Sequence, residues 1–117
     1  MMPCMSPRWL RRAVIICLIA LGFGCQAPRG PVSISSEDPD LKIQAIEQDV
    51  ALKNTTDIPK MVQNLQSDDV AIRFYAIQAL RRLTNDDFGY RFYEDDDQRA
   101  PATALWKKWL KRQKLGQ

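Results

Sequence analysis

The sequence predicts an all-α fold, a short α-solenoid of four helices that follows an N-terminal signal peptide and a flexible linker. Beyond residue 37, apolar residues recur at helical spacing in four segments, and no segment shows the sustained alternation of a strand. The chain also repeats itself with an offset of 31 residues, which aligns 38–42 with 69–73 and 45–46 with 76–77. Repeats of a few tens of residues, each with two helices, are typical of α-solenoids.

Residues 1–24 predict an export signal. Three arginines (Arg8, Arg11 and Arg12) precede an apolar run of 11 residues, 13–23, which ends just before Gly24 and Cys25. A basic start, an apolar core and a small residue before the cleavage site are the features of a signal peptide. The run is too short to span a bilayer, which takes about 20 apolar residues.

Residues 21–25, Leu-Gly-Phe-Gly-Cys, resemble the lipobox of bacterial lipoproteins. The leucine stands four positions before the cysteine instead of the usual three, and Phe23 occupies a place normally given to a small side chain. The resemblance implies that Cys25 is lipidated and anchors the protein to a bacterial membrane in the cell envelope, facing the periplasm or the exterior. An uncleaved signal anchor and cleavage by the ordinary signal peptidase near Ala27 are the alternatives. Cys25 is the one cysteine left after the signal, and a lone thiol in an oxidising compartment favours acylation.

The charge distribution argues against a nucleic-acid partner. The chain has 17 basic and 14 acidic residues, but three of the basic residues and none of the acidic ones precede Cys25. From Cys25 onward the two counts are therefore equal, at 14 each. The exported part has no excess of positive charge with which to attract nucleic acid.

A single small domain is expected after the signal. Residues 26–37 are rich in Pro, Gly and Ser and have no helical period, which predicts a flexible linker over 25–37. The folded domain is then expected over 38–117. Its first repeat covers 38–66, and its second covers 67–114 with an insertion at 85–99.

Four helices are expected in this domain, at 39–53, 58–66, 70–83 and 100–114. Helix-capping residues precede the first three (Asp38; Asp57 or Thr56; Asp68 and Asp69), and a proline falls in the first turn of three of the four (Pro39, Pro59 and Pro101). The apolar faces are expected to consist of Leu41, Ala45, Ile46 and Val50 in the first helix, Ile58, Met61, Val62 and Leu65 in the second, and Leu105, Trp106, Trp109 and Leu110 in the fourth.

The third helix carries two apolar stripes and is expected to lie between two neighbours. The stripes are Val70, Phe74 and Ile77 beside Ile72, Ala76, Leu80 and Leu83. Its remaining face would expose Tyr75, Gln78 and Arg82, which could contact a partner.

The segment 58–83 resembles the HEAT-repeat family. Residues 58–65, then Asp68 and Asp69, then Ile72, Arg73, Ala76, Ala79, Leu80 and Leu83 look like the second helix of one repeat and the first helix of the next. In that family a proline begins the second helix, an aspartate caps the following helix, and an arginine one turn in lies by the turn between repeats. Asp69 and Arg73 occupy the last two positions here.

The resemblance covers about 38–84 and is weaker in the first repeat. Gln48 and Asp49 stand where Ala79 and Leu80 do, so the far end of the first repeat is expected to be less well buried. The chain is also similar to small exported HEAT-type lipoproteins of some environmental bacteria, through the tail that runs from Phe88-Gly89-Tyr90 to Trp109. That similarity implies no activity.

The insertion at 85–99 is the expected partner surface. It carries four aromatic residues (Phe88, Tyr90, Phe92 and Tyr93) and the acidic run 94–97. Segments of this length in a small domain are usually functional or are packed over the core. Tyr75 and Arg82 would extend the surface on the third helix.

The residue types argue against enzymatic chemistry. The chain has no histidine, the commonest general base, and no glycine-rich phosphate loop, and Cys25 has no partner for nucleophilic work. The acidic run lacks the alternation and central glycine of a calcium loop. No catalytic residue, cofactor, metal or small-molecule substrate is therefore expected.

Three functions remain, and an enzyme is the least favoured of them. The first is a membrane-anchored protein-interaction module that binds an unknown protein of the envelope. The alternative is a membrane-surface or envelope-structural protein whose C-terminal helix, with Trp106 and Trp109 beside several basic residues, lies on an anionic membrane. The first interpretation is favoured because two repeats rarely bury a continuous core alone. The C-terminal helix could close the apolar end of the repeats with its tryptophans inward, and those tryptophans would then not face a membrane.

Overall fold

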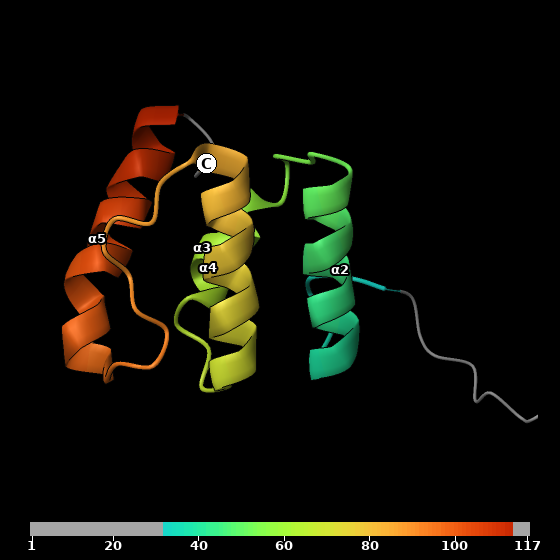
Figure 1. The fold of residues 1–117 in the computed structure, drawn as a ribbon, viewed down its shortest axis with the longest axis horizontal. Helices are drawn as coiled ribbons and strands as arrows, with labels where there is room; N and C mark the ends of the chain where they lie inside the picture. Colours follow the sequence, from blue (N-terminus) through green and yellow to red (C-terminus); the bar gives the residue numbers. More distant parts are fainter. Residues whose placement is uncertain (1–31, 114–117) are drawn as a thin grey trace, which may run out of the picture.

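The structure is a computed structural model that describes residues 32–113 (Figure 1). Cys25, the predicted signal peptide and the first part of the predicted linker lie outside the described residues. The described chain forms four helices, α2 (Pro39–Ala51), α3 (Ile58–Asn64), α4 (Val70–Thr84) and α5 (Asp96–Gln113), with no strand among these residues. The predicted all-α class is confirmed.

Aspartate caps place the starts of α2 and α4 at the predicted residues. The Asp38 carboxylate accepts a hydrogen bond from the Asp40 N–H at 2.9 Å. The Asp69 carboxylate accepts from the N–H groups of Ala71 and Ile72 at 2.8 and 3.4 Å. Each cap satisfies amides that lack a partner within the helix and is worth about 1 kcal/mol.

The ends of the helices follow local backbone geometry. Asn85 ends α4 with φ 60°, in the left-handed region that asparagine tolerates better than most residues. At the end of α3, Leu65 and Gln66 donate to the carbonyls three residues earlier, at 3.2 and 3.1 Å. This tighter turn ends the α-helix at Asn64, two residues before its predicted end.

The start of α5 differs from the prediction. The helix begins at Asp96, four residues before the predicted start, so Pro101 lies inside it and not in its first turn. Pro101 has no N–H to give the carbonyl one turn back, which costs one hydrogen bond. Asp96 and Asp97 favour the earlier start because acidic side chains stabilise the first turn of a helix. Arg99 pairs with Asp96 across that turn.

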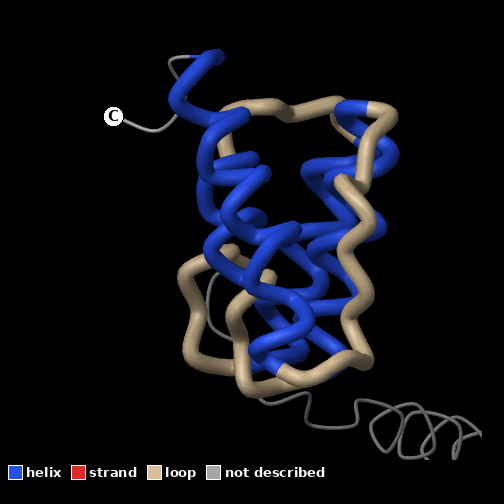
Figure 2. The backbone as a smooth tube through the Cα atoms, turned by 90° about the vertical axis from the view of Figure 1, so that its left-hand side faces the viewer, coloured by secondary structure: helices blue, strands red, loops and turns tan. Residues whose placement is uncertain are grey.

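Helices α3 and α4 are the central pair of the four. Helix α4 packs against α2 and α3, and α3 also contacts α5. Helices α2, α4 and α5 run in the same direction, from the bottom to the top of Figure 1, and α3 lies behind α4. The segment 85–95 runs along the length of the helices as a loop (Figure 2).

The core lies where α3 and α4 meet their neighbours. Met61, Leu65, Leu80 and Trp106 are fully buried, and Ile46 is 1% exposed. Trp106 and the half-buried Trp109 stack edge to face with their ring centroids 5.7 Å apart. The tryptophans of α5 thus face inward.

The packed chain begins earlier than the sequence predicts. Ile34 falls within the predicted linker, yet it is 5% exposed and belongs to the same core cluster as Ile46 and Met61. The predicted boundary at residue 38 is therefore too late.

Two further predictions about burial are wrong. Val70 and Leu105 were expected on apolar faces but are 49% and 46% exposed.

The prediction that the far end of the first repeat is less well buried is confirmed, because Gln48 is exposed where Ala79 is 2% exposed, and Asp49 is 8% exposed where Leu80 is fully buried. Asp49 accepts a hydrogen bond from the Asn54 side chain at 2.7 Å. Burial raises the pKa of Asp49 above its ordinary value.

Candidate functional site

Three of the four aromatic residues in the 85–95 loop pack inward. The Phe88 and Trp106 rings pack edge to face with their centroids 4.7 Å apart, and the Phe92 and Phe74 rings do so with their centroids 5.0 Å apart. Tyr90 is 5% exposed, and its hydroxyl donates a hydrogen bond to the Leu65 carbonyl. Burial raises the pKa of Tyr90. These side chains cover the core between α4 and α5, so they are not available as the accessible partner surface that the sequence suggests.

Arg73 fixes both the loop and the turn before α4. Its Nη1 donates to the carbonyls of Ser67 and Asp68 at 2.6 and 2.9 Å, and its Nε donates to the carbonyl of Phe92 at 2.9 Å. Arg73 as a whole is 9% exposed. The guanidinium of one arginine therefore satisfies three carbonyls, in the turn at 67–68 and in the loop at residue 92.

Tyr93 is the aromatic residue of the loop that faces solvent. Its side chain is 63% exposed, and its hydroxyl accepts a hydrogen bond from Arg91 at 3.3 Å. The predicted loop surface thus reduces to Tyr93 and its neighbour Arg91.

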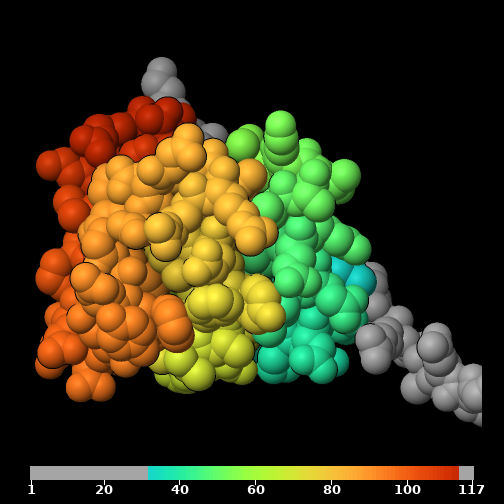
Figure 3. All heavy atoms as spheres, viewed as in Figure 1, coloured from blue at the N-terminus to red at the C-terminus, as the bar shows by residue number. Residues whose placement is uncertain are grey.

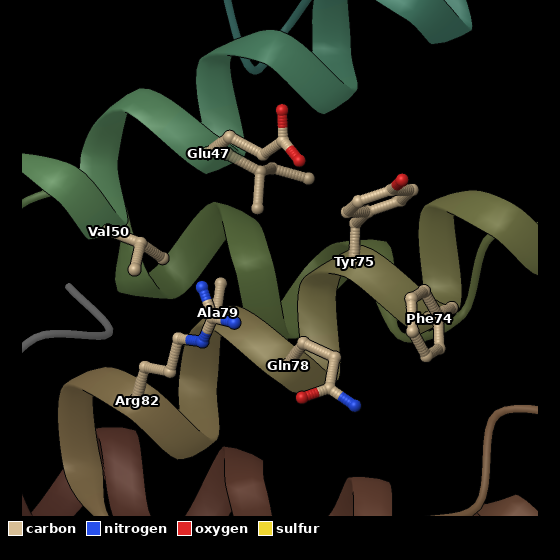
Figure 4. Close-up of a pocket in the computed structure, with 8 residues that line it drawn as sticks. Glu47, Val50, Phe74, Tyr75, Gln78, Ala79 and Arg82 are labelled. Carbon is tan, nitrogen blue, oxygen red and sulfur yellow. The ribbon is translucent and has the colours of Figure 1, made fainter.

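Tyr75 and Arg82, the predicted surface residues of α4, line a groove between α4 and α2 (Figure 4). The groove has a volume of about 390 Å³. Its lining comes from Ile46, Glu47 and Val50 of α2 and from Phe74, Tyr75, Gln78, Ala79 and Arg82 of α4. Figure 3 shows the face on which it lies, where α2 (green), α4 (yellow) and the loop (orange) are side by side.

The groove combines an apolar floor with a charged rim. Ile46 and Ala79 are 1% and 2% exposed and form the floor, and Phe74 and Val50 are half-buried at its sides. Glu47 and Arg82 are exposed and supply opposite charges from the two helices. Because α2 and α4 run in the same direction, Glu47 lies beside Tyr75, and Val50 lies toward Arg82 (Figure 4).

Sequence reasoning missed the α2 side of this groove. Glu47, Val50 and Ile46 were assigned only to a helix or its apolar face. The 31-residue offset aligns Glu47 with Gln78, which was predicted to lie on the outward face of the third helix. The repeat therefore contained a signal that Glu47 occupies the equivalent face of α2.

The groove itself contains few chemically distinctive groups. Among residues 32–113, no group of three or more acidic, cysteine or histidine side chains is placed to hold a metal ion. The one carboxyl group in that range with a clearly raised pKa, Asp49, does not line the groove. The groove thus offers one carboxylate, one guanidinium and an apolar floor to a ligand.

Helices long and apolar enough to cross a bilayer do not occur in the described part of the chain. Neither family models, curated proteins nor solved structures give a match to this sequence.

Proposed function

We propose that this chain is a non-enzymatic, HEAT-like protein-interaction module held at a membrane of the bacterial cell envelope by a lipid on Cys25, and that the groove between α2 and α4 receives its protein partner. The observation that carries the proposal is the groove itself. It joins an apolar floor to charges of both signs on the two helices that the 31-residue offset makes equivalent.

Two features support the HEAT-like arrangement. Helices α2 and α4, each the first of a predicted pair, pack side by side, as first helices of successive repeats do in a solenoid. Arg73 donates to the Ser67 and Asp68 carbonyls in the turn that precedes α4, the place that the family resemblance implies for this arginine.

The groove favours a protein segment over a small polar molecule. Its buried floor can accept aliphatic side chains, and burial of apolar surface contributes about 25 cal/mol per Å². Glu47 and Arg82 can then orient the segment through charges of opposite sign. Tyrosine and arginine, both present here, are the residue types most often found at energetically dominant interface positions.

The membrane anchor is proposed from the sequence. The basic start, the apolar run 13–23 and the cysteine that follows Gly24 support export with lipidation at Cys25. A domain held at the membrane meets a partner there at high effective concentration, so a small groove can suffice for binding.

Two double variants of the full chain test the groove. A tagged protein is expressed in a bacterial host, its partner is captured from the membrane fraction and identified, and the recovered amount is then measured for each variant. Tyr75→Ala with Arg82→Glu changes the groove, and Tyr93→Ala with Arg91→Glu makes the same exchanges on the loop. We expect the amount of recovered partner to fall at least tenfold for the groove variant, because loss of two central interface residues typically has an effect of this size. For the loop variant the amount should stay within about twofold.

The reverse result, loss with the loop variant and retention with the groove variant, would contradict the assignment of the groove. The tagged chain itself also reports on the anchor. Its N-terminal peptide should begin at an acylated Cys25, whereas a peptide that begins upstream or near Ala27 would remove the lipid from the proposal.

A further inference from the structure

The outer face of α5 carries a basic patch in its C-terminal half, made of Lys107, Lys108, Lys111 and Arg112. All four side chains are exposed. Among the described residues, the ion pairs use other basic groups (Lys60, Arg81, Arg91 and Arg99), so none of the four in the patch is neutralised by a direct partner there.

The acidic residues of α5 are too far along the helix to neutralise the patch. Asp96 and Asp97 lie in the first turn, and no acidic residue follows Asp97 in the sequence. At 1.5 Å per residue, Asp97 and Lys107 are separated by about 15 Å along the axis. That exceeds the Debye length of about 8 Å at physiological salt, so the acidic end screens the basic end only weakly.

A purely structural role does not account for the whole patch. Basic residues in the last turn stabilise a helix by offsetting the negative end of its dipole, which applies to Lys111 and Arg112. Lys107 and Lys108 precede the last turn, where this effect has faded. The C-terminal end of α4 lies at the same end of the molecule and adds Arg81 and Arg82, the first of which pairs with Asp87 (Figure 1).

We propose that the basic patch binds the anionic lipid headgroups of a membrane surface. Four long basic side chains spread over about two turns of an exposed helix face present a broad positive surface, which suits a planar anionic surface. Val32 is the seventh residue after Cys25, and a chain of that length reaches about 25 Å at most when fully extended. A lipid on Cys25 would therefore keep the domain within reach of the bilayer. The described chain begins beside α2, on the side of the molecule opposite α5 (Figure 1), so the orientation of the patch toward the membrane rests on its charge and not on the lipid.

The contact is electrostatic and does not involve insertion of the helix. Trp106 is fully buried, and Trp109 packs against it. Leu105 is the one large apolar side chain exposed on α5. An inserted amphipathic helix needs a whole apolar face turned to the lipid, and here that face is occupied by the core.

Lysine footprinting on vesicles tests the proposal with the full chain. The protein is bound to vesicles of phosphatidylcholine alone or with about 30% phosphatidylglycerol, and the rate of amine acylation at each lysine is read by mass spectrometry. Near an anionic surface, each basic residue contributes an attraction equivalent to about fivefold in affinity. We expect acylation of Lys107, Lys108 and Lys111 to slow about fivefold or more on the anionic vesicles at low salt and to recover at high salt. Lys42 and Lys53, on or just after α2, serve as internal controls and should change less than twofold.

A charge-matched pair of variants completes the test. Lys107→Glu with Lys108→Glu and Lys111→Glu should abolish the salt-sensitive part of binding to anionic vesicles. Lys42→Glu with Lys53→Glu and Lys60→Glu, which changes the net charge equally, should retain most of it. Equal acylation on both kinds of vesicle, or equal loss in both variants, would overturn the proposal. Protection by added polyglutamate but not by anionic vesicles would also overturn it, because it would assign the patch to an acidic protein.

Discussion

Replacing Ile77 with aspartate is expected to unfold the domain. Ile77 lies in the middle of α4, is 4% exposed and belongs to the core cluster. A carboxylate at this position would be buried without a partner, at a cost of at least about 4 kcal/mol. Small domains are stable by about 5–15 kcal/mol in total, so little or no folded protein should remain at 37 °C.

The adjacent residue provides the control. Gln78 is half-buried in the groove wall, where a carboxylate can reach water, and an aspartate introduced there would lie one turn from Arg82 on the same face. Gln78→Asp is expected to cost about 0.5 kcal/mol, mainly through lower helix propensity. Thermal unfolding followed by circular dichroism at 222 nm measures both. Equal melting temperatures for the two variants would show that the buried face of α4 has been assigned wrongly.

Replacing Arg73 with methionine is the second change for which we expect a large loss. Methionine retains much of the apolar stem but leaves the carbonyls of Ser67, Asp68 and Phe92 without their donor. Hydrogen bonds from a charged group are worth about 1.5–3 kcal/mol each, and partial access of water to the freed carbonyls brings the expected total to about 3 kcal/mol. The midpoint of urea unfolding, with an unchanged slope, measures this loss.

Arg81→Met is the matched control for Arg73→Met. Arg81 is on the same helix and is exposed, and its one ion pair, with Asp87, spans 3.6 Å. Exposed pairs of this kind contribute about 0.5 kcal/mol or less. Arg73→Lys should fall between the two, because one ammonium is not shaped to bond the carbonyls of both the turn and the loop at once. If Arg73→Met and Arg81→Met were equally stable, Arg73 would not hold the loop and the turn together.

The sequence predicts the helices well where a local signal decides them. Asp38 and Asp69 fix the starts of α2 and α4 because a side-chain cap depends only on the next few residues. The start of α5 depends on a competition between local effects. A proline usually marks the first turn, but here Asp96, Asp97 and the Arg99 ion pair extend the helix upstream of Pro101.

The candidate site is less predictable because it depends on contacts between distant segments. Tyr90 looks like a surface residue in an acidic loop, and its burial depends on the Leu65 carbonyl, 25 residues away. Tyr75, Gln78 and Arg82 lie on one face of α4 as predicted, but Tyr75 and Gln78 are half-buried and not exposed. That the face borders a groove follows only once α2 is packed beside it, which no pattern within α4 can specify.

The proposed partner site depends on the side-by-side packing of α2 and α4, which encloses the groove. Methyl nuclear Overhauser measurements on the full chain test it most directly. Cross-peaks are expected between the methyl groups of Ile46 in α2 and Ala79 in α4, which share the groove floor. Cross-peaks between α3 and α4 without any between α2 and α4 would contradict it, because the groove and its proposed partner site would then not exist.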